Sequence, residues 1–562
     1  MPISLSFSLV CYSKLSAVKI VLAQLNYHIG NFEFNTSKII DTILRSAQEG
    51  ADLVVFAELA IGGYPAQDFL EFDDFLNRCE DALRQIASNC QDIACIVGTP
   101  IRNDEPKGKP LFNAAAFCYQ NQIQYFRKSL LPNYDVFDEY RYFEPSTSFS
   151  LLHFKGHKIA LTICEDIWDV GNNRLYTINP MEELIAQQPD LMINIAASPF
   201  NYNQAQTRLK VLRANVLKYK IPLIYVNQTG AQTELLFDGG SLIFHANGKV
   251  KQSLAFFKEE AVTVETDDLL KNGPEKDLQE IPDKIALIHD ALVMGIGDYF
   301  RKMGFSKAIL GLSGGIDSAV TLALAAKALG PENVHSLLLP SQFSSDHSIA
   351  DAVSLVNNLG STSETIAIEP LFEAFMSQLK PGLKGKPFDV TEENIQARIR
   401  GVLLMAISNK FGYILLNTSN KSESAVGYGT LYGDMNGGLS VLGDVYKTGV
   451  YELAHYINRA KIIIPVNSIL KPPSAELRPN QKDSDSLPNY DVLDEILTQY
   501  IEFRKGPDEL ISAGFDKDVV KKVLRLVNLN EYKRKQTPPI LRISPKAFGM
   551  GRRMPIVGKY LL

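Results

Sequence analysis

The sequence is poor in cysteine, and its cysteines form no recognisable set. Among 562 residues there are six, all in the first third of the chain: Cys11, Cys79, Cys90, Cys95, Cys118 and Cys164. Their number and spacing match neither a disulfide framework nor the paired ligands of a zinc site. We therefore expect free thiols in a reducing, cytoplasmic compartment, where a cysteine with a chemical role must be recognised from its surroundings.

Long apolar runs and an excess of positive charge are also missing. No stretch approaches the roughly 18 consecutive apolar residues of a membrane-spanning helix. The net charge is -6 at pH 7 and the pI is about 5.9, which argues against extensive binding to nucleic-acid phosphates. With 46% hydrophobic and 21% charged residues, the composition is that of a globular protein, and we expect neither a membrane nor a nucleic acid as partner.

The first 17 residues stand apart from the rest of the chain. Residues 3–11 are mildly apolar, but no positive charge precedes them, so they do not match a secretory signal. We expect residues 1–17 to be a disordered extension or the result of a misassigned start, with the first strand beginning at Val18.

A chain of this length predicts two or three domains, and the sequence shows one clear boundary. Between residues 266 and 283 the hydrophobic periodicity fails, and polar residues, Gly273, Pro274 and Pro282 accumulate. Strand-like and helix-like segments alternate on both sides of this stretch, which is typical of α/β folds with buried strands. We predict one α/β domain at 18–265, a linker at 266–283 and a second α/β domain at 284–562.

The individual segments follow from their periodicity. Strands of the first domain are predicted at 18–25, 52–56, 94–98, 113–118, 158–163, 191–196, 223–227, 240–245 and 261–265, with a helix at 34–48. In the second domain we predict helices at 284–303, 319–329 and 393–409 and strands at 308–312, 334–339, 365–368 and 413–416. We expect a Gly-rich mobile loop at 427–443 and a surface loop or lid at 472–488.

The most informative segment is an octapeptide between a predicted strand and a predicted helix of the second domain. It consists of Gly311, Leu312, Ser313, Gly314, Gly315, Ile316, Asp317 and Ser318. Glycines let the backbone approach a ligand, the N–H groups of a starting helix bind anions, and Asp317 can hold Mg²⁺ against a phosphate. The octapeptide lacks the lysine of a Walker loop. It resembles the loop of the ATP pyrophosphatase (PP-loop) family, which implies a parallel-sheet, adenine nucleotide α-hydrolase-like domain that grips the pyrophosphate of ATP.

Three residues of the first domain suit the hydrolysis of an amide. Glu58 and Cys164 each stand at the end of an apolar strand, where α/β folds place functional groups, and Lys128 precedes an aromatic-rich segment. A thiolate can attack an amide carbonyl, a carboxylate can move the proton, and an ammonium group can stabilise the oxyanion. Taken singly, each residue has a structural interpretation: a buried thiol, a strand-end acid or a surface lysine.

Together, in the order Glu, Lys, Cys, these residues resemble the catalytic triad of the nitrilase (carbon–nitrogen hydrolase) superfamily. The resemblance spans about 18–265. It implies an αββα sandwich in which Glu58, Lys128 and Cys164 are catalytic, whereas the other five cysteines lack such surroundings.

The resemblance extends to the glutaminase members of that superfamily. It implies that Tyr134 and Ser198 bind the substrate glutamine. The position six residues after this serine is usually basic in the family and is Gln204 here. We assign Gln204 to glutamine binding as a hydrogen-bonding residue, and Arg208 is a candidate for the missing charge.

Nearly the whole chain, from Val18 to Ile556, resembles the glutamine-dependent NAD synthetase family. That resemblance implies an enzyme that adenylates the nicotinate carboxylate of deamido-NAD with ATP and Mg²⁺. Ammonia from glutamine then displaces AMP to give NAD. The implied partners are the small molecules glutamine, deamido-NAD and ATP, together with further copies of the chain in a homo-oligomer.

The same resemblance implies roles for residues of the second domain. ATP binding is implied for the octapeptide, Thr418 and Lys447, and Mg²⁺ binding for Asp317 and Glu423. Deamido-NAD binding is implied for Asn394, Glu423, Tyr428, Gly429, Thr430, Leu431 and Lys533. Taken alone, the run of cations around Lys533 is typical of a solvated charge cluster.

Three alternatives remain open at this stage. Another PP-loop amidotransferase or a tRNA-modifying PP-loop enzyme would share the octapeptide, but the latter often carries catalytic cysteines in its second half and a basic face. Here the second half has no cysteine and the net charge is negative. A degenerate, inactive scaffold would have lost the triad or Asp317. An enzyme that uses only free ammonia is favoured by Gln204 alone.

Overall fold

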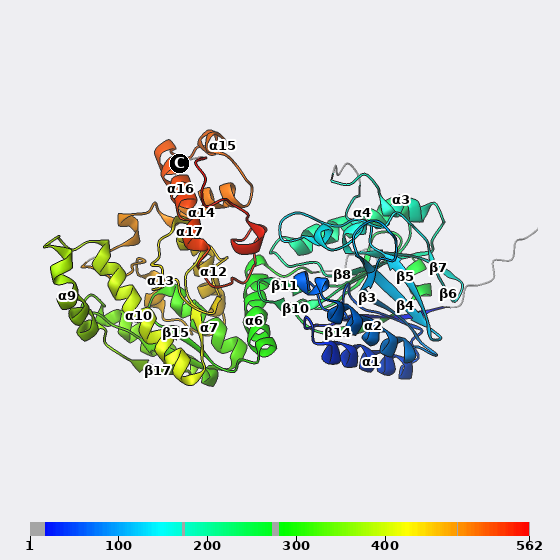
Figure 1. The fold of residues 1–562 in the computed structure, drawn as a ribbon, viewed down its shortest axis with the longest axis horizontal. Helices are drawn as coiled ribbons and strands as arrows, with labels where there is room; N and C mark the ends of the chain where they lie inside the picture. The colour runs from blue at the N-terminus through cyan, green and yellow to red at the C-terminus, as the bar shows by residue number, and fades with distance from the viewer. Residues whose placement is uncertain (1–16, 171–174, 272–279, 480, 561–562) are drawn as a thin grey trace, which may run out of the picture.

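The computed structural model describes residues 17–170, 175–271, 280–479 and 481–560. The extension predicted at 1–17 lies outside these ranges apart from its last residue. Two α/β units lie side by side, and the chain passes from the first (blue to green in Figure 1) to the second (green to red). The five cysteines in the described ranges are all free thiols, as the sequence predicted.

The first unit contains two six-stranded sheets. In spatial order, the first sheet consists of β14 (Glu260–Glu265), β1 (Lys19–Gln24), β2 (Leu53–Val55), β3 (Ala94–Arg102), β4 (Leu111–Tyr119) and β5 (Gln122–Arg127). The second consists of β13 (Val250–Ser253), β12 (Leu242–Phe244), β9 (Leu223–Asn227), β8 (Leu191–Ala196), β7 (His157–Ile163) and β6 (Leu152–Phe154). β1 pairs with β14 in antiparallel register, so the first and last strands of this unit are neighbours.

Alternating apolar residues explain how these sheets are layered. In β1, Ile20 and Leu22 join the core shared by the two sheets, while Val21 and Ala23 face the opposite side, against helices. The first sheet is covered by α1 (Phe32–Gln48) and α2 (Asp73–Ser88), the second by α3 (Pro180–Ile185) and α4 (Gln204–Tyr219). The result is the predicted αββα sandwich. A hairpin of β10 (Thr229–Gln232) and β11 (Leu235–Asp238) adjoins it.

The second unit is built on a five-stranded parallel sheet. Its spatial order is β17 (Thr362–Thr365), β16 (Val334–Leu338), β15 (Ala308–Gly311), β18 (Ile414–Asn417) and β19 (Leu439–Ser440). One face packs against α6 (Lys284–Met303), α7 (Ile316–Leu329), α8 (Asp346–Leu359) and α12 (Lys447–Ile457). The other face packs against α10 (Val390–Phe411), with α9 (Glu369–Leu383) beside it. Helices on both faces are what buried parallel strands require.

The remaining helices are short or belong to the C-terminal part. Four of them pack around a separate apolar cluster: α11 (Lys421–Val426), α14 (Tyr490–Ile501), α15 (Pro507–Ser512) and α16 (Lys517–Leu529). The short helix α17 (Glu531–Arg534) follows α16. Of these, α14, α15, α16 and α17 form the orange and red group at the top of Figure 1. α13 (Val466–Leu470) packs near α7 and α8, and α5 (Thr266–Leu270) follows β14.

The two units share a packed interface. Gly295 of α6 lies so close to the first unit that an added Cβ would be 3.1 Å from Leu236 of that unit. Asp298, one turn further along α6, accepts hydrogen bonds of 2.7 Å from Asn26 Nδ2 and from a backbone N–H of β10. Apolar contact and buried hydrogen bonds together hold the units in a fixed relation.

Most predicted elements are present, and the exceptions have simple reasons. β17 lies at Thr362–Thr365 rather than at 365–368, because this edge strand pairs through exposed polar residues that carry no apolar alternation. α5 occupies part of the predicted linker, and α7 begins inside the octapeptide. The segment 472–488 contains no α-helix among its described residues, but Asp483 and Leu487 within it are buried. No helix in the described ranges is long and apolar enough to span a bilayer.

Candidate active sites

Cys164 lies at a tight turn directly after β7. Its φ is 44°, in the left-handed region that non-glycine residues rarely adopt, and its side chain is buried. Asp166 fixes the turn by accepting backbone N–H groups from Ile163 at 3.1 Å, Ser129 at 2.9 Å and Leu130 at 2.8 Å. One carboxylate therefore ties the Cys164 turn to the segment that carries Lys128.

Lys128 is held between two buried carboxylates. Its Nζ donates to Glu58 Oε1 and to Glu139 Oε2, both at 2.7 Å, and all three side chains are buried. Glu58 also accepts Asn113 Nδ2 at 2.7 Å and Ala197 N at 2.9 Å. These contacts leave Glu58 few other positions, which is what a group that must move a proton over a short distance requires.

The electrostatics of this cluster favour a neutral thiol at rest. Burial raises the pKa of Cys164 well above 9.0, and Glu58 adds to this, while Lys128 opposes it. Burial opposes the charge on Lys128, but Glu139 and Glu58 outweigh it and raise the pKa of its ammonium group. Burial raises the pKa of Glu139 to about 7. An attack by Cys164 therefore needs a base, and Glu58 is placed to be one.

Glu139 was not predicted as a site residue. It follows Lys128 by eleven positions and lies in the aromatic-rich segment noted in the sequence. Tyr64 donates its hydroxyl to Glu139 Oε1 at 3.1 Å, so both carboxylate oxygens of Glu139 are occupied. Glu139 reaches Lys128 because the loop between them folds back on itself. The sequence showed only that this loop is rich in acidic and aromatic residues.

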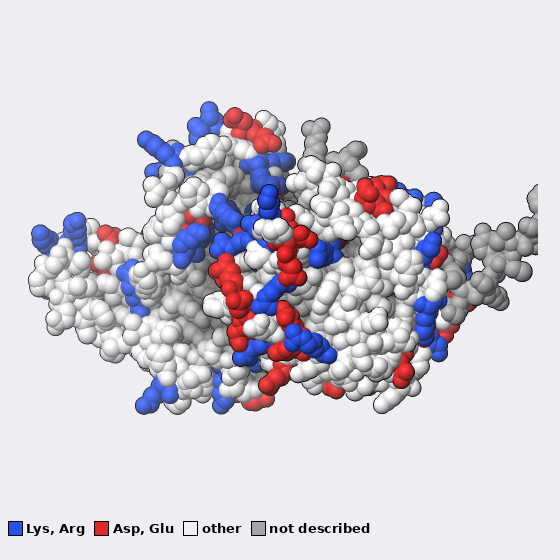
Figure 2. Space-filling model, turned by 45° about the vertical axis from the view of Figure 1, so that its right-hand side comes forward, with Lys and Arg blue, Asp and Glu red and all other residues white. Residues whose placement is uncertain are grey.

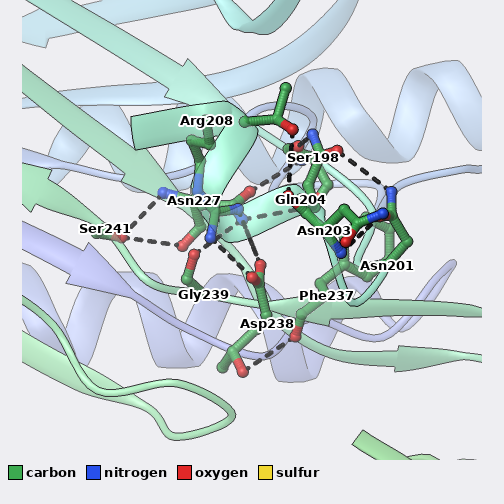
Figure 3. Close-up of polar contacts among 12 residues, drawn as sticks. Ser198, Asn201, Asn203, Gln204, Arg208, Asn227, Phe237, Asp238, Gly239 and Ser241 are labelled. Atoms are coloured by element: carbon green, nitrogen blue, oxygen red, sulfur yellow. Dashed lines mark hydrogen bonds and ion pairs between the residues drawn. The ribbon is translucent and has the colours of Figure 1, made fainter. Parts of the chain in front are cut away.

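The residues predicted to bind glutamine lie on two loops of the first unit. Tyr134 is 40% exposed and donates to Glu165, the neighbour of Cys164, at 3.0 Å. Gln204, the first residue of α4, donates to Ser198 Oγ at 3.2 Å, as Figure 3 shows. The structure therefore brings Ser198 and Gln204 together, and it places Tyr134 beside the turn that carries Cys164.

Arg208 does not supply the charge that Gln204 lacks. Its guanidinium makes two parallel contacts with Asp238, at 2.9 and 2.7 Å, and both side chains are buried (Figure 3). Asn227 Nδ2 approaches the same carboxylate and also donates to Gly239 O. The suggestion that Arg208 replaces a basic residue at position 204 is thus wrong, because its charge is already neutralised within the core.

The second unit contains a cavity of about 300 Å³ at the carboxyl ends of its parallel strands. The octapeptide forms one wall, and α7 begins at Ile316 within it, with its first turn pointing into the space. Gly314 has a φ of +76°, and an added Cβ would lie 2.1 Å from Ser348 O. Only glycine fits this position, so the turn between β15 and α7 depends on Gly314.

A charged cluster lies beside the octapeptide. Lys447 Nζ contacts Asp317 Oδ2 at 2.5 Å and Glu423 Oε1 at 3.5 Å, and Asn420 Nδ2 donates to Asp317 Oδ1 at 2.9 Å. Burial raises the pKa of Glu423 to about 8, and repulsion from Asp317 adds to this, while Lys447 opposes it. Buried Asp483 lines the same cavity, and its Oδ1 has no hydrogen-bond partner among the described residues.

The predicted substrate residues of this unit divide into two groups. Thr418, Glu423, Tyr428 and Lys447 line the cavity with the octapeptide. The second group lies outside the wall of this cavity, where Thr430 Oγ1 donates to Asn394 Oδ1 at 2.6 Å.

The other members of the second group support the same loop. Lys533 Nζ donates to Gly427 O at 2.8 Å and to Gly429 O at 2.9 Å, and Leu431 O accepts from Arg398. These contacts hold the 427–431 loop in place, and the residues that make them lie outside the cavity wall.

Some cavity residues were not predicted. They are Arg400, Lys471, Glu476 and Asp483. Arg400 lies on α10, as Asn394 does, and burial lowers its pKa to about 10. The other three lie at the start of the predicted 472–488 loop or within it, so this loop forms a wall of the site.

Each of the two units matches a known protein family. The carbon-nitrogen hydrolase family model matches residues 19–272, and the NAD synthase family model matches residues 288–537. The glutamine-dependent NAD(+) synthetase of Synechocystis sp. is 46% identical over 553 residues, covering 96% of this chain and 98% of the relative. The chain belongs to the glutamine-dependent NAD(+) synthetase family.

Other members of the family agree. The synthetase of Acinetobacter baylyi is 43% identical, covering 97% of this chain and 99% of the relative. A solved synthetase from Acinetobacter baumannii, in complex with adenosine diphosphate, superposes with a TM-score of 0.76 at 40% identity, covering 96% and 99% of the two chains. The predicted family, fold class and enzymatic nature are confirmed. The residue roles and the domain boundaries at 265 and 284 stay predictions.

Proposed function

We propose that this chain converts deamido-NAD to NAD with ATP, using ammonia that it releases from glutamine. The observation that carries the proposal is the presence, in one chain of this family, of a buried Glu–Lys–Cys cluster and an ATP-type cavity joined by a packed interface. A glutaminase releases ammonia, and an adenylated carboxylate is the acceptor that ammonia can attack.

In the glutaminase site, Cys164 attacks the side-chain amide of glutamine. Glu58 takes the thiol proton and passes it to the leaving ammonia, while Lys128 stabilises the oxyanion. Water then releases glutamate from the thioester, with Glu58 as base again. Tyr134, Ser198 and Gln204 hold the substrate. The raised pKa of Cys164 supports the role of Glu58 as a base, because the thiol must lose its proton during the attack.

In the synthetase site, the octapeptide, Thr418 and Lys447 bind ATP. The nicotinate carboxylate attacks the α-phosphate and releases pyrophosphate, and ammonia then displaces AMP. Glu423 and Tyr428 form the deamido-NAD side of the cavity. Asn394, Gly429, Thr430, Leu431 and Lys533 are assigned to deamido-NAD through the 427–431 loop and lie outside the cavity wall. The protein contributes mainly position and charge to such a reaction. The cavity and the helix start of α7 support the assignment of ATP.

The acidic residues of this site fit Mg²⁺. Within the described ranges, no three or more His, Cys, Asp or Glu side chains are arranged to hold a metal ion by themselves. Mg²⁺, however, is usually bound by one or two carboxylates together with substrate phosphates. Asp317 and Glu423 would supply these carboxylates, and the unpartnered oxygen of Asp483 leaves a further acceptor in the same wall. The bound ion would neutralise phosphate charge.

A homo-oligomer is supported by an unburied helix. None of the described residues of α9 is buried, and Leu371, Phe375 and Leu379, spaced by four, are 41%, 50% and 40% exposed. Such a stripe on one helix face is typical of a surface covered by another subunit. A second copy of this chain is the partner we propose. The substrates and the free thiols fit a cytoplasmic location.

The test measures NAD formation from deamido-NAD, ATP and Mg²⁺ with either glutamine or ammonium as the nitrogen donor. Wild type should use both donors, and Cys164→Ala only ammonium. Cys79→Ala, which removes a buried thiol from α2, is the matched control and should keep both activities. If wild type uses ammonium alone, the first unit is no glutaminase. If neither donor yields NAD, the synthetase assignment is wrong.

A further inference from the structure

A large cavity at the boundary between the two units belongs to neither proposed active site. Its volume is about 470 Å³, compared with about 300 Å³ for the ATP-type cavity. Tyr134 and Phe137 of the first unit line one side, and residues within 500–506 and 546–560 of the second unit line the rest. Neither the Glu–Lys–Cys cluster nor the octapeptide forms part of its wall. The cavity is therefore distinct from both sites.

The charged groups of this cavity are mostly basic. Its wall holds five cations and one acid, although the whole chain carries a net charge of -6 at pH 7. They are Arg504, Lys505, Lys546, Arg552, Arg553 and Asp135. Figure 2 shows a group of basic side chains in the upper middle of the molecule, near the boundary between the units. A concave surface lined by charges of one sign attracts ligands of the opposite sign, so this cavity favours an anion.

Two of the five cations have no acidic partner. The other three each lie near a carboxylate: Lys546 is 3.1 Å from Asp135, Arg552 is 2.7 Å from Glu531, and Arg553 is 3.6 Å from Asp138. Arg504 and Lys505 form no ion pair within the part of the chain that the structure describes. Arg504 also has a φ of 60°, in the left-handed region that non-glycine residues rarely adopt away from functional positions.

Aromatic rings line the same cavity. They belong to Tyr134, Phe137, Tyr500 and Tyr560. Tyr134 is 40% exposed and Tyr560 is 78% exposed, so neither ring is fully covered by protein. Phe137 holds the ring of Tyr134 in an edge-to-face contact, with the ring centres 5.4 Å apart. An oriented and exposed ring beside free cations suits a ligand that combines a flat base with phosphate groups.

We infer that this cavity is a third ligand site, which binds a nucleotide with two or more phosphate groups. Arg504 and Lys505 bind the phosphates, because guanidinium and ammonium groups match phosphate oxygens, and the ring of Tyr134 stacks on the base. A single carboxylate would engage one cation and leave the rings uncovered. The volume lies within the usual range of about 300–1,000 Å³ for small-molecule sites. Mononucleotides and dinucleotides share this chemistry.

Occupation of the cavity should hinder glutamine binding. The hydroxyl of Tyr134 donates to Glu165, the neighbour of Cys164, at 3.0 Å, and Tyr134 is one of the residues proposed to hold glutamine. A nucleotide stacked on this ring would therefore compete with glutamine. This consequence rests on the proposed function, whereas the binding of the nucleotide does not.

The test measures ADP binding to the full-length protein by isothermal titration calorimetry. Gly314→Ala disturbs the ATP-type cavity, so that the third site is measured alone. The test variant is Arg504→Gln with Lys505→Gln. Its matched control is Lys521→Gln with Arg525→Gln, which removes one lysine and one arginine from the exposed face of α16, outside the cavity. Inorganic tripolyphosphate, NAD and glutamate serve as competitors.

Wild type and the control should bind two ADP molecules per chain, and Gly314→Ala should bind one. The test variant should weaken the second site by at least about tenfold, in wild type and in the Gly314→Ala background. Tripolyphosphate should displace ADP from this site and glutamate should not. Displacement by NAD would assign the site to dinucleotides, and its failure would assign the site to mononucleotides. With ADP at about ten times its Kd, KM for glutamine in Gly314→Ala should rise about tenfold at constant kcat.

Three results would overturn the inference: a single ADP per chain in wild type, equal affinity of the third site in the test variant and the control, or displacement of ADP by glutamate. An unchanged KM for glutamine with ADP bound would refute the stacking on Tyr134. The wild-type comparison keeps the test valid if Gly314→Ala fails to fold. Failure of the proposed function is separate, because wild type would then bind two ADP molecules but hydrolyse no glutamine.

Discussion

Substitution of Glu139, the second carboxylate beside Lys128, is the most direct test of how the glutaminase site works. Glu139→Gln keeps the size of the side chain and an oxygen that can accept from Lys128, but it removes one of the two negative charges beside the buried ammonium group. The hydroxyl of Tyr64 can accept from the new amide as well as donate to it, so the packing should be retained.

The expected loss of glutaminase activity can be estimated from the charges of Lys128 and Glu139. Well above pH 7, where Glu139 with its pKa of about 7 is ionised, two unit charges about 4 Å apart attract by about 4 kcal/mol at an effective dielectric constant of about 20. Part of this is offset, because the repulsion between Glu139 and Glu58 is removed as well. This attraction holds the Lys128 ammonium group charged and in place. A net loss of about 2–3 kcal/mol from that charged, positioned form corresponds to a fall in kcat/KM for glutamine of about 30- to 160-fold.

The assay compares glutamine hydrolysis with ammonium-dependent NAD formation. The first should fall by the stated factor, and the second should remain at the wild-type rate. Glu144→Gln is the control, since Glu144 lies five residues further along and its carboxylate accepts the backbone N–H of Lys109 at 2.7 Å, away from Lys128. Glutamine hydrolysis at the wild-type rate in Glu139→Gln would refute the reasoning, as would an equal loss of both activities.

Three further predictions concern other parts of the molecule. Gly314→Ala should lower NAD formation with either donor about 100-fold, because its Cβ would lie 2.1 Å from Ser348 O, while glutamine hydrolysis measured without ATP persists; loss of both would contradict this. Because burial raises the pKa of Cys164 well above 9.0, its alkylation by iodoacetamide, followed as loss of glutaminase activity, should accelerate about tenfold per pH unit from pH 7 to 9 without a plateau. Burial favours neutral Asp298, but Lys302 and other partners outweigh it and hold the pKa below 3.8. Asp298→Asn should therefore lower the free energy of unfolding by about 1–3 kcal/mol at neutral pH. The difference should be complete above pH 3.8 and shrink below it, so a difference in urea unfolding that stays constant down to pH 3 would argue against this role.

Much of this molecule could be predicted because its signals are local. The strands at Leu191–Ala196 and Leu223–Asn227 are buried on both faces and stand in the sequence as short apolar runs, so their bounds agree with the structure residue by residue. The octapeptide was equally visible, because the turn needs glycine at Gly314 and the helix start needs small and acidic residues. In each case the physical cause lies within a few residues.

The residues that were missed depend on contacts between distant parts of the chain. Glu139 acts on Lys128 only because a loop returns over the sheet, and acidic residues in loops are ordinary. Arg208 was misjudged for the same reason: it lies on α4, and Asp238, which neutralises it, comes from β11, thirty residues away. Local sequence does not specify such pairings, because many arrangements of the same residues satisfy the periodicity equally well.

The pairing of β1 with β14 bears on how the protein is made. The first strand of the N-terminal unit finds its neighbour only when residues 260–265 have left the ribosome, about 240 residues after β1 itself. Until then β1, which is buried in the finished sheet, is its exposed edge strand and can pair with other chains. Contacts of such long sequence separation are slow to form. Synthesis of this unit should therefore be the step most dependent on chaperones and most prone to aggregation during overproduction.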